Sequence, residues 1–94
     1  MGFRKIRGIG VSYSRQGQIY FALANYSAMP AKTKKGIDRL IREAAYEGNS
    51  AGDVYEKALR AWLIEGEAWQ TVIDRYHVRP NTLLEKRKWI YQHW

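Results

Sequence analysis

WQTVIDRYHVRPNTLLEKRKWIYQHW, residues 69–94, is the stretch that decides the fold of this chain. Its apolar residues recur every three or four positions up to Tyr76, and the same spacing resumes after Pro80, so the stretch predicts two helices. Residues 77–79 separate them and form a tight turn. Pro80 suits the first position of the second helix, because its fixed φ angle is helical and the N–H that it lacks has no helical partner there.

Two helices joined by so short a turn predict a helix-turn-helix over residues 67–94, whose second helix lies in a groove of DNA. The side chains expected to be buried between the helices and in the turn are Ile73, Tyr76, Val78 and Leu83. Two residues depart from the usual pattern. Ile73 stands where a small residue is common, and His77 stands where glycine commonly makes the turn, which requires a histidine at positive φ.

The rest of the chain predicts three further helices, so the expected fold class is all-α with about five short helices. Apolar residues at helical spacing, with breaks at Pro30, Gly48 and Gly66, define the boundaries. The expected helices span about 15–28, 30–47, 51–65, 67–76 and 80–94. Residues 15–94 form a single helical domain in this interpretation, and residues 1–14 form a basic flexible arm.

Length and composition set further limits. A chain of 94 residues supports one domain with a modest core. It has no cysteine, so disulfides and thiolate metal sites are excluded, which agrees with a reducing cytoplasm. No run approaches the roughly 18 apolar residues of a membrane span, and none resembles a signal peptide. We therefore expect a soluble, cytoplasmic protein without a membrane partner.

The net charge of +7 is unevenly distributed. Residues 1–35 carry seven Lys or Arg and no acid, residues 36–74 carry four bases and eight acids, and residues 75–94 carry five bases and one acid. Two basic ends around an acidic middle suit a polyanion held by the ends. The alternative is a charge that only keeps the protein soluble.

The segment TVIDRYHVRPNTLLEKRKW, residues 71–89, resembles the DNA-reading end of small helix-turn-helix regulators. These include the region of bacterial sigma factors that reads the −35 element. A fuller set, formed by QIYFALANYSAMP, the helix around IDRLIREAAYEG and the C-terminal helix pair, resembles small phage and prophage regulators of transcription. The resemblance covers residues 16–94 and implies a DNA-binding role in bacterial transcription.

Matched to the motif of such regulators, four residues occupy the positions that face base edges: Asn81, Thr82, Glu85 and Lys86. Asn pairs with adenine, Lys with guanine, and Glu accepts from cytosine. Contacts to phosphate are expected from Arg79, Arg87, Lys88, Gln70 and Thr71. The alternative for all these residues is a solvated helix face.

The basic N-terminal residues Arg4, Lys5 and Arg7 are further candidates for contact with the DNA backbone or minor groove. A disordered basic tail is the alternative for them. One helix of about 14 residues reads few base pairs, so we expect RNA polymerase or a second copy of the chain as a partner. The acidic middle, around Tyr55 and Trp62, is the expected contact surface.

These features favour a sequence-specific regulator of transcription that binds double-stranded DNA. The alternative is a non-catalytic protein-interaction module, such as a phage adaptor that acts on a host protein, in which the helix pair is only architecture. Catalysis is not expected, because His77 and His93 have no neighbouring ligand or nucleophile motif. The sequence likewise predicts neither a metal nor a cofactor.

Overall fold

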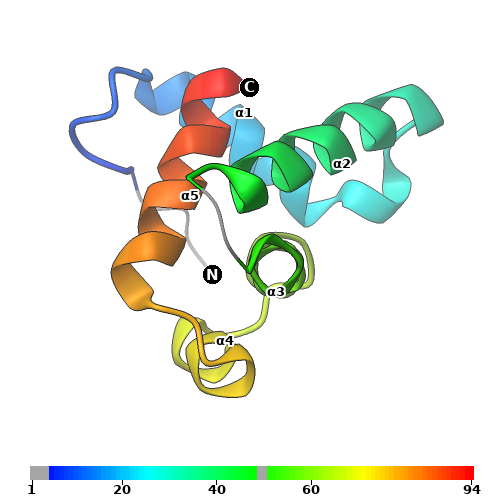
Figure 1. Cartoon of the computed structure of the whole chain (residues 1–94). Coiled ribbons are helices and arrows are strands. Elements are labelled where there is room, and N and C mark those ends of the chain that lie inside the picture. The colour runs from blue at the N-terminus through cyan, green and yellow to red at the C-terminus, as the bar shows by residue number, and fades with distance from the viewer. Residues whose placement is uncertain (1–4, 49–50) are drawn as a thin grey trace.

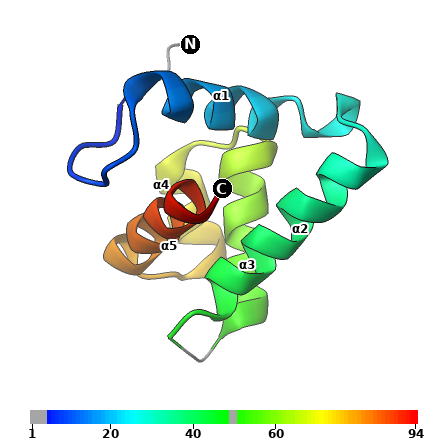
Figure 2. The same cartoon turned by 90° about the horizontal axis from the view of Figure 1, so that it is seen from above.

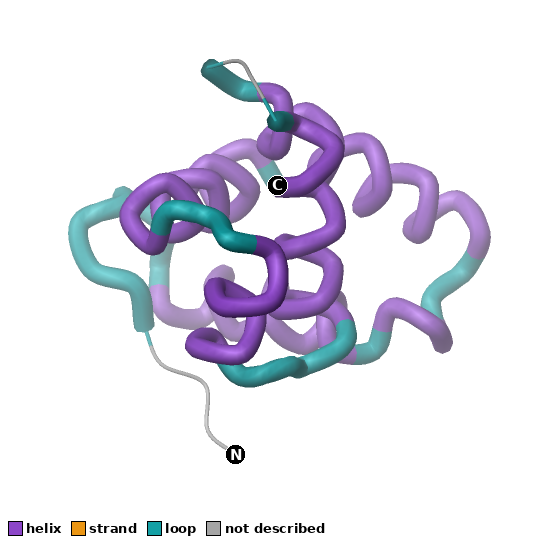
Figure 3. The backbone as a smooth tube through the Cα atoms, turned by 60° about the horizontal axis from the view of Figure 1, so that its bottom comes forward, coloured by secondary structure: helices purple, strands orange, loops and turns teal. Residues whose placement is uncertain are grey.

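The computed structural model describes residues 5–48 and 51–94, and over these residues the chain forms five α-helices and no β-strand (Figures 1 and 3). The prediction of an all-α fold with about five short helices is therefore confirmed. The helices are α1 (Tyr13–Ala24), α2 (Ala31–Tyr46), α3 (Gly52–Leu59), α4 (Trp69–Tyr76) and α5 (Pro80–His93). A 3₁₀ turn, Tyr26–Ala28, follows α1, and a π-helical stretch, Arg60–Ile64, extends α3.

The helix α3 with its π-helical extension is central, since it contacts each of the other four helices. Seen from above, α1 lies along one side of the molecule and α2 along another, while α5 packs against α2 and α3 (Figure 2). The core draws apolar side chains from every helix, including Ile19, Leu23, Ile41, Leu59, Val72, Leu83 and Ile90, each almost fully buried. Helical spacing of apolar residues thus produces one shared core.

The π-helical stretch is fixed by a polar network at the edge of this core. The Asp38 carboxylate accepts hydrogen bonds from the Tyr26 hydroxyl at 2.7 Å and from the Arg60 guanidinium at 2.8 Å. Burial alone would raise the pKa of Asp38, but these two hydrogen bonds lower it below its ordinary value. The network joins the 3₁₀ turn, α2 and the π-helical stretch.

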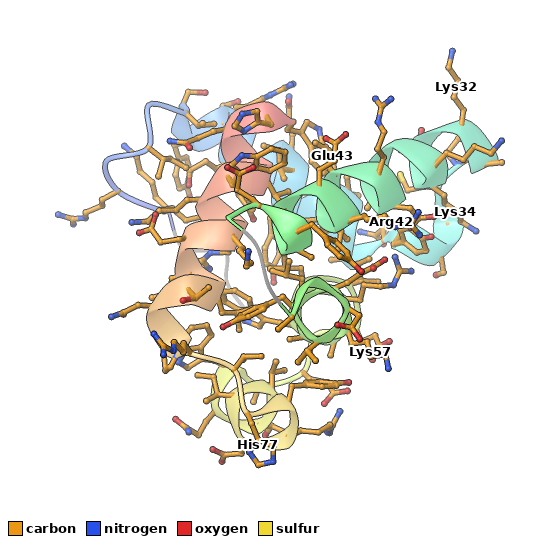
Figure 4. The ribbon with its side chains drawn as sticks, in the orientation of Figure 1. Lys32, Lys34, Arg42, Glu43, Lys57 and His77 are labelled. Atoms are coloured by element: carbon orange, nitrogen blue, oxygen red, sulfur yellow. The ribbon has the colours of Figure 1, made fainter. Side chains whose placement is uncertain are left out.

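The turn between α4 and α5 has the conformation that the sequence required of it. His77 lies in the left-handed region, with φ 56° and ψ 41°, and its N–H donates to the Ile73 carbonyl at 2.9 Å. This geometry ends α4 in the way that glycine usually does. Figure 4 shows the His77 side chain at the tip of the molecule, pointing into solvent.

The N-terminal segment differs from the prediction of a flexible arm. Residues 5–12, here called the N-terminal loop, fold against the helices and bury Ile6 and Ile9 in the core. The sequence alternates buried isoleucine with exposed Lys5 and Arg7, a pattern that the basic character of the segment obscured. Arg4, the third predicted contact of this segment, lies outside the described residues.

Gln16 of α1 holds the N-terminal loop in place. Its side chain is fully buried, and its Oε1 accepts from the Ile6 N–H at 2.6 Å. Its Nε2 donates to the Ile6 carbonyl at 3.0 Å and to the Val11 carbonyl at 2.8 Å. One carboxamide therefore satisfies three backbone groups that the loop would otherwise leave without partners.

Among the described residues, no helix is both long enough and apolar enough to cross a membrane.

Replacing Gln16 by Ala should lower the free energy of unfolding by roughly 2–3 kcal/mol, because three backbone groups lose their partner. Urea denaturation followed by circular dichroism measures the change. Gln18→Ala, an exposed position in the same helix, is the matched control and should change stability by less than about 0.5 kcal/mol. Equal effects of the two substitutions would contradict the role assigned to Gln16.

Candidate nucleic-acid interface

The four residues predicted to read bases all line one groove between α5 and the end of α2, but only three of them belong to the outward face of α5. Asn81 and Glu85 are exposed, Thr82 is half-buried, and all three line one shallow groove between α5 and the end of α2. Lys88 continues this face, since positions 81, 85 and 88 follow the i, i+4, i+7 spacing of one helix side. The Lys88 ammonium lies 3.6 Å from the Glu85 carboxylate.

Lys86 lines the groove as well, but its ammonium is directed into the protein. It is only 7% exposed, and its Nζ donates to the carbonyls of Ala44 at 3.0 Å and Glu47 at 2.9 Å. These carbonyls belong to the C-terminal end of α2, where a cation is favoured by the helix dipole. The ammonium also lies 5.1 Å from the centre of the Tyr55 ring. The prediction that Lys86 reads a base edge is therefore corrected, because its donors are used inside the protein.

Arg87 is also directed inward. Its guanidinium carbon lies 4.7 Å from the centre of the Trp62 ring, which in turn packs on Trp69 with ring centres 4.8 Å apart. Burial lowers the pKa of Arg87, although the pKa of a guanidinium starts so far above neutrality that the group stays charged. This placement argues against the predicted phosphate contact and makes Arg87 an anchor of α5.

Helical spacing was the signal that could have identified both residues. Lys86 lies three residues after Leu83 and four before Ile90, and Arg87 lies four before Tyr91. Leu83, Ile90 and Tyr91 are buried, so both basic residues fall on the core side of α5. The positive charge of this segment suggested a surface position, whereas the spacing of its apolar neighbours indicated the buried one.

The remaining predicted phosphate contacts lie at the surface. Arg79 is exposed at the start of α5, and its backbone N–H donates to the Tyr55 hydroxyl at 3.2 Å. Gln70 and Thr71 are exposed in the first turn of α4, where Gln70 donates to Asp74 at 3.1 Å. The helix pair therefore offers donors on both of its exposed N-terminal turns.

The two aromatic residues named for the contact surface of a protein partner are used in packing. Tyr55 is buried, with its hydroxyl accepting from Arg79 and its ring beneath Lys86. Trp62 is half-buried and covered by Arg87. Both aromatic rings contribute to the packing that holds α5 rather than to an open surface.

Comparison of the chain with protein-family models, with curated proteins and with solved structures gives no match. In the described part of the chain, no group of three or more His, Asp or Glu side chains is arranged to hold a metal ion. We therefore infer the ligand of the α4–α5 surface from the chemistry of its own side chains.

Lys86→Met should lower the free energy of unfolding by roughly 1–3 kcal/mol, because two buried carbonyls lose a charged donor. Lys88→Met removes the same charge from the exposed side of α5 and should change stability by less than about 0.5 kcal/mol. Chemical denaturation of the two variants makes the comparison. A costly Lys88 variant beside a neutral Lys86 variant would contradict the inward placement.

His77→Gly should raise the free energy of unfolding by about 0.5–1 kcal/mol, since glycine adopts the left-handed conformation without steric cost. The shift in thermal midpoint reports the gain. Thr71→Gly, on the exposed side of α4, is the control and should have the opposite sign because glycine weakens a helix. If both substitutions lower the free energy of unfolding, the His77 imidazole must make a contact that stabilises the protein by more than the strain of its left-handed backbone costs.

Proposed function

We propose that the protein is a sequence-specific DNA-binding regulator of transcription, of the phage or prophage type, with α5 in the major groove. The observation that carries this proposal is the orientation of α5. Lys86 and Arg87 hold one side of the helix in the protein, and the opposite side carries the exposed Asn81 and Glu85 and the half-buried Lys88. A helix anchored in this way offers a rigid row of polar side chains, which direct readout of bases requires.

The exposed residues divide by chemistry into two groups. Asn81 suits adenine, whose major-groove edge has one donor and one acceptor, and Glu85 suits the amino group of cytosine. Thr82 supplies a hydroxyl and a methyl group between them. Arg79 and Lys88 then contact phosphates, which fix the register of the helix without reading sequence.

The N-terminal turn of α4 is proposed to contact the DNA backbone as well. Gln70 and Thr71 are exposed there, and the first N–H groups of a helix favour a phosphate. Contacts from the first turns of both helices place α4 across the backbone and α5 within the groove, as in a helix-turn-helix.

A single α5 limits how much sequence one chain can read. Its 14 residues span about 21 Å, which covers only a few base pairs. A second copy of the chain or RNA polymerase is proposed to supply the remaining specificity. Tyr55 is buried and Trp62 is half-buried, so these two rings contribute little area to such a contact.

A protein-interaction module remains the second candidate, and one observation favours it. Tyr13, Tyr20 and Phe21 are 58%, 38% and 65% exposed, and their i, i+7, i+8 spacing places them on one side of α1. Aromatic side chains are enriched in protein interfaces. In this reading α5 is architecture, and substitutions on its exposed side leave binding of the protein partner unchanged.

Selection of bound sequences from a random duplex pool tests the proposal, because a reading helix must enrich a defined site. On the selected duplex, Asn81→Ala should cost about 1–3 kcal/mol of binding and relax the preference at one base pair. Lys88→Ala should weaken all sequences alike. The two variants are matched, since both lie on the exposed side of α5 and neither touches the core.

No enrichment of any sequence, or binding that survives Asn81→Ala with unchanged preference, would contradict the assignment of α5 as the reader. A folded protein that binds no duplex at low salt would instead favour the interaction module.

A further inference from the structure

We infer that the N-terminal loop, residues 5–12, is a preformed second DNA contact that places Lys5 and Arg7 on the phosphate backbone beside the groove occupied by α5. The inference rests on the proposed function and adds a part that a flexible tail would not supply. Its basis is the position of the loop, its rigidity and its charge.

The position of the loop is set by α5 itself. Gln92 Nε2 donates to the Ile9 carbonyl at 3.1 Å, a contact between residues 83 positions apart in the chain. Gln92 lies four residues after Lys88, so it continues the exposed side of α5 toward its C-terminal end. The loop therefore stands where this face ends, as its place beside the C-terminal end of α5 shows (Figure 1).

The loop is ordered before any partner binds. Ile6 and Ile9 are buried, and the Gln16 carboxamide bonds the backbone on both sides of the bend. Gly8 and Gly10 have positive φ angles of 75° and 73°, which allow the chain to reverse between the two anchors. A contact that is already ordered costs less conformational entropy on binding than a tail that must be immobilised.

The charge of the loop suits phosphate. Lys5 and Arg7 are both exposed, and residues 5–12 contain no acid. On α5, by contrast, Lys88 lies beside Glu85, and on α4 Arg75 pairs with Glu67 at 2.7 Å. Long cationic side chains on an exposed loop contact backbone oxygens more readily than the hydrogen-bonding edges of bases.

The two proposed contact regions give different salt dependence. Each phosphate neutralised on duplex DNA contributes about −0.9 to the slope of log affinity against log salt. Arg79 and Lys88 alone predict a slope of about −1.8, whereas these two with Lys5 and Arg7 predict about −3.6. The salt slope measured for the unmodified protein on its selected duplex therefore distinguishes DNA contact through α5 alone from contact through both α5 and the N-terminal loop.

The decisive comparison uses two double variants that remove the same charge. Lys5→Ala with Arg7→Ala should reduce the slope by about 1.8 and weaken all sequences alike, with the preferred sequence unchanged. Lys32→Ala with Lys35→Ala is the control. These exposed lysines lie in the first turns of α2, and Figure 4 shows Lys32 pointing away from α5 into solvent. The control should change the slope by much less than 1.

Equal losses of slope in the two double variants would overturn the inference, because net charge alone would then explain the effect. The proposed function can fail separately. If the wild-type protein selects no duplex, both the proposed function and the loop contact are contradicted. If selective binding depends on Asn81 but not on Lys5 and Arg7, only the loop contact is contradicted. Thermal unfolding of each variant verifies that the fold is intact.

Gln16→Ala tests whether the loop acts as a fixed contact, since this substitution removes the three hydrogen bonds that hold the loop against α1 without removing charge. Affinity for the selected duplex should fall several-fold because the loop must then be ordered on binding. Gln18→Ala, an exposed carboxamide on α1, is the matched control. Unchanged affinity in the Gln16 variant would overturn the claim that the loop is held in place for binding.

Discussion

The Lys86 ammonium, held between the carbonyls of Ala44 and Glu47, is the interaction on which the arrangement of α5 depends. It supplies the end of α2 with a cation that the last turn of α2 itself does not contain. Burying an amine without such acceptors would cost free energy. The contact therefore fixes the rotation of α5 about its axis and its position along α2. Arg87 on Trp62 secures the neighbouring side of the same helix.

This use of charge inside the protein changes how the basic C-terminal segment is understood. Of the three consecutive bases Lys86, Arg87 and Lys88, only Lys88 belongs to the outward face. Net charge therefore overstates the electrostatic attraction that α5 can exert on DNA. The proposed interface must draw cations from other segments, which is why we propose the N-terminal loop as a second contact.

Local rules predicted the helices well, because each boundary carries its own signal. Pro30 and Pro80 immediately precede or open helices, and His77 has the positive φ that the turn required. For Lys86, the positive charge predicted a position on the surface, whereas the spacing of its apolar neighbours predicted a buried one. The prediction followed the charge and was wrong. The docking of the loop could not be predicted from local rules, since Gln16 and Gln92 act through contacts that depend on the completed fold.

The bond from Gln92 to the Ile9 carbonyl joins the first described segment of the chain to its last helix. During synthesis on the ribosome the N-terminal residues emerge first, and chain growth proceeds toward α5. The Ile9 carbonyl has no access to this partner until α5 has left the exit tunnel. The N-terminal loop can therefore take its place against α5 only after α5 has been synthesised, and the proposed DNA-binding surface needs both segments.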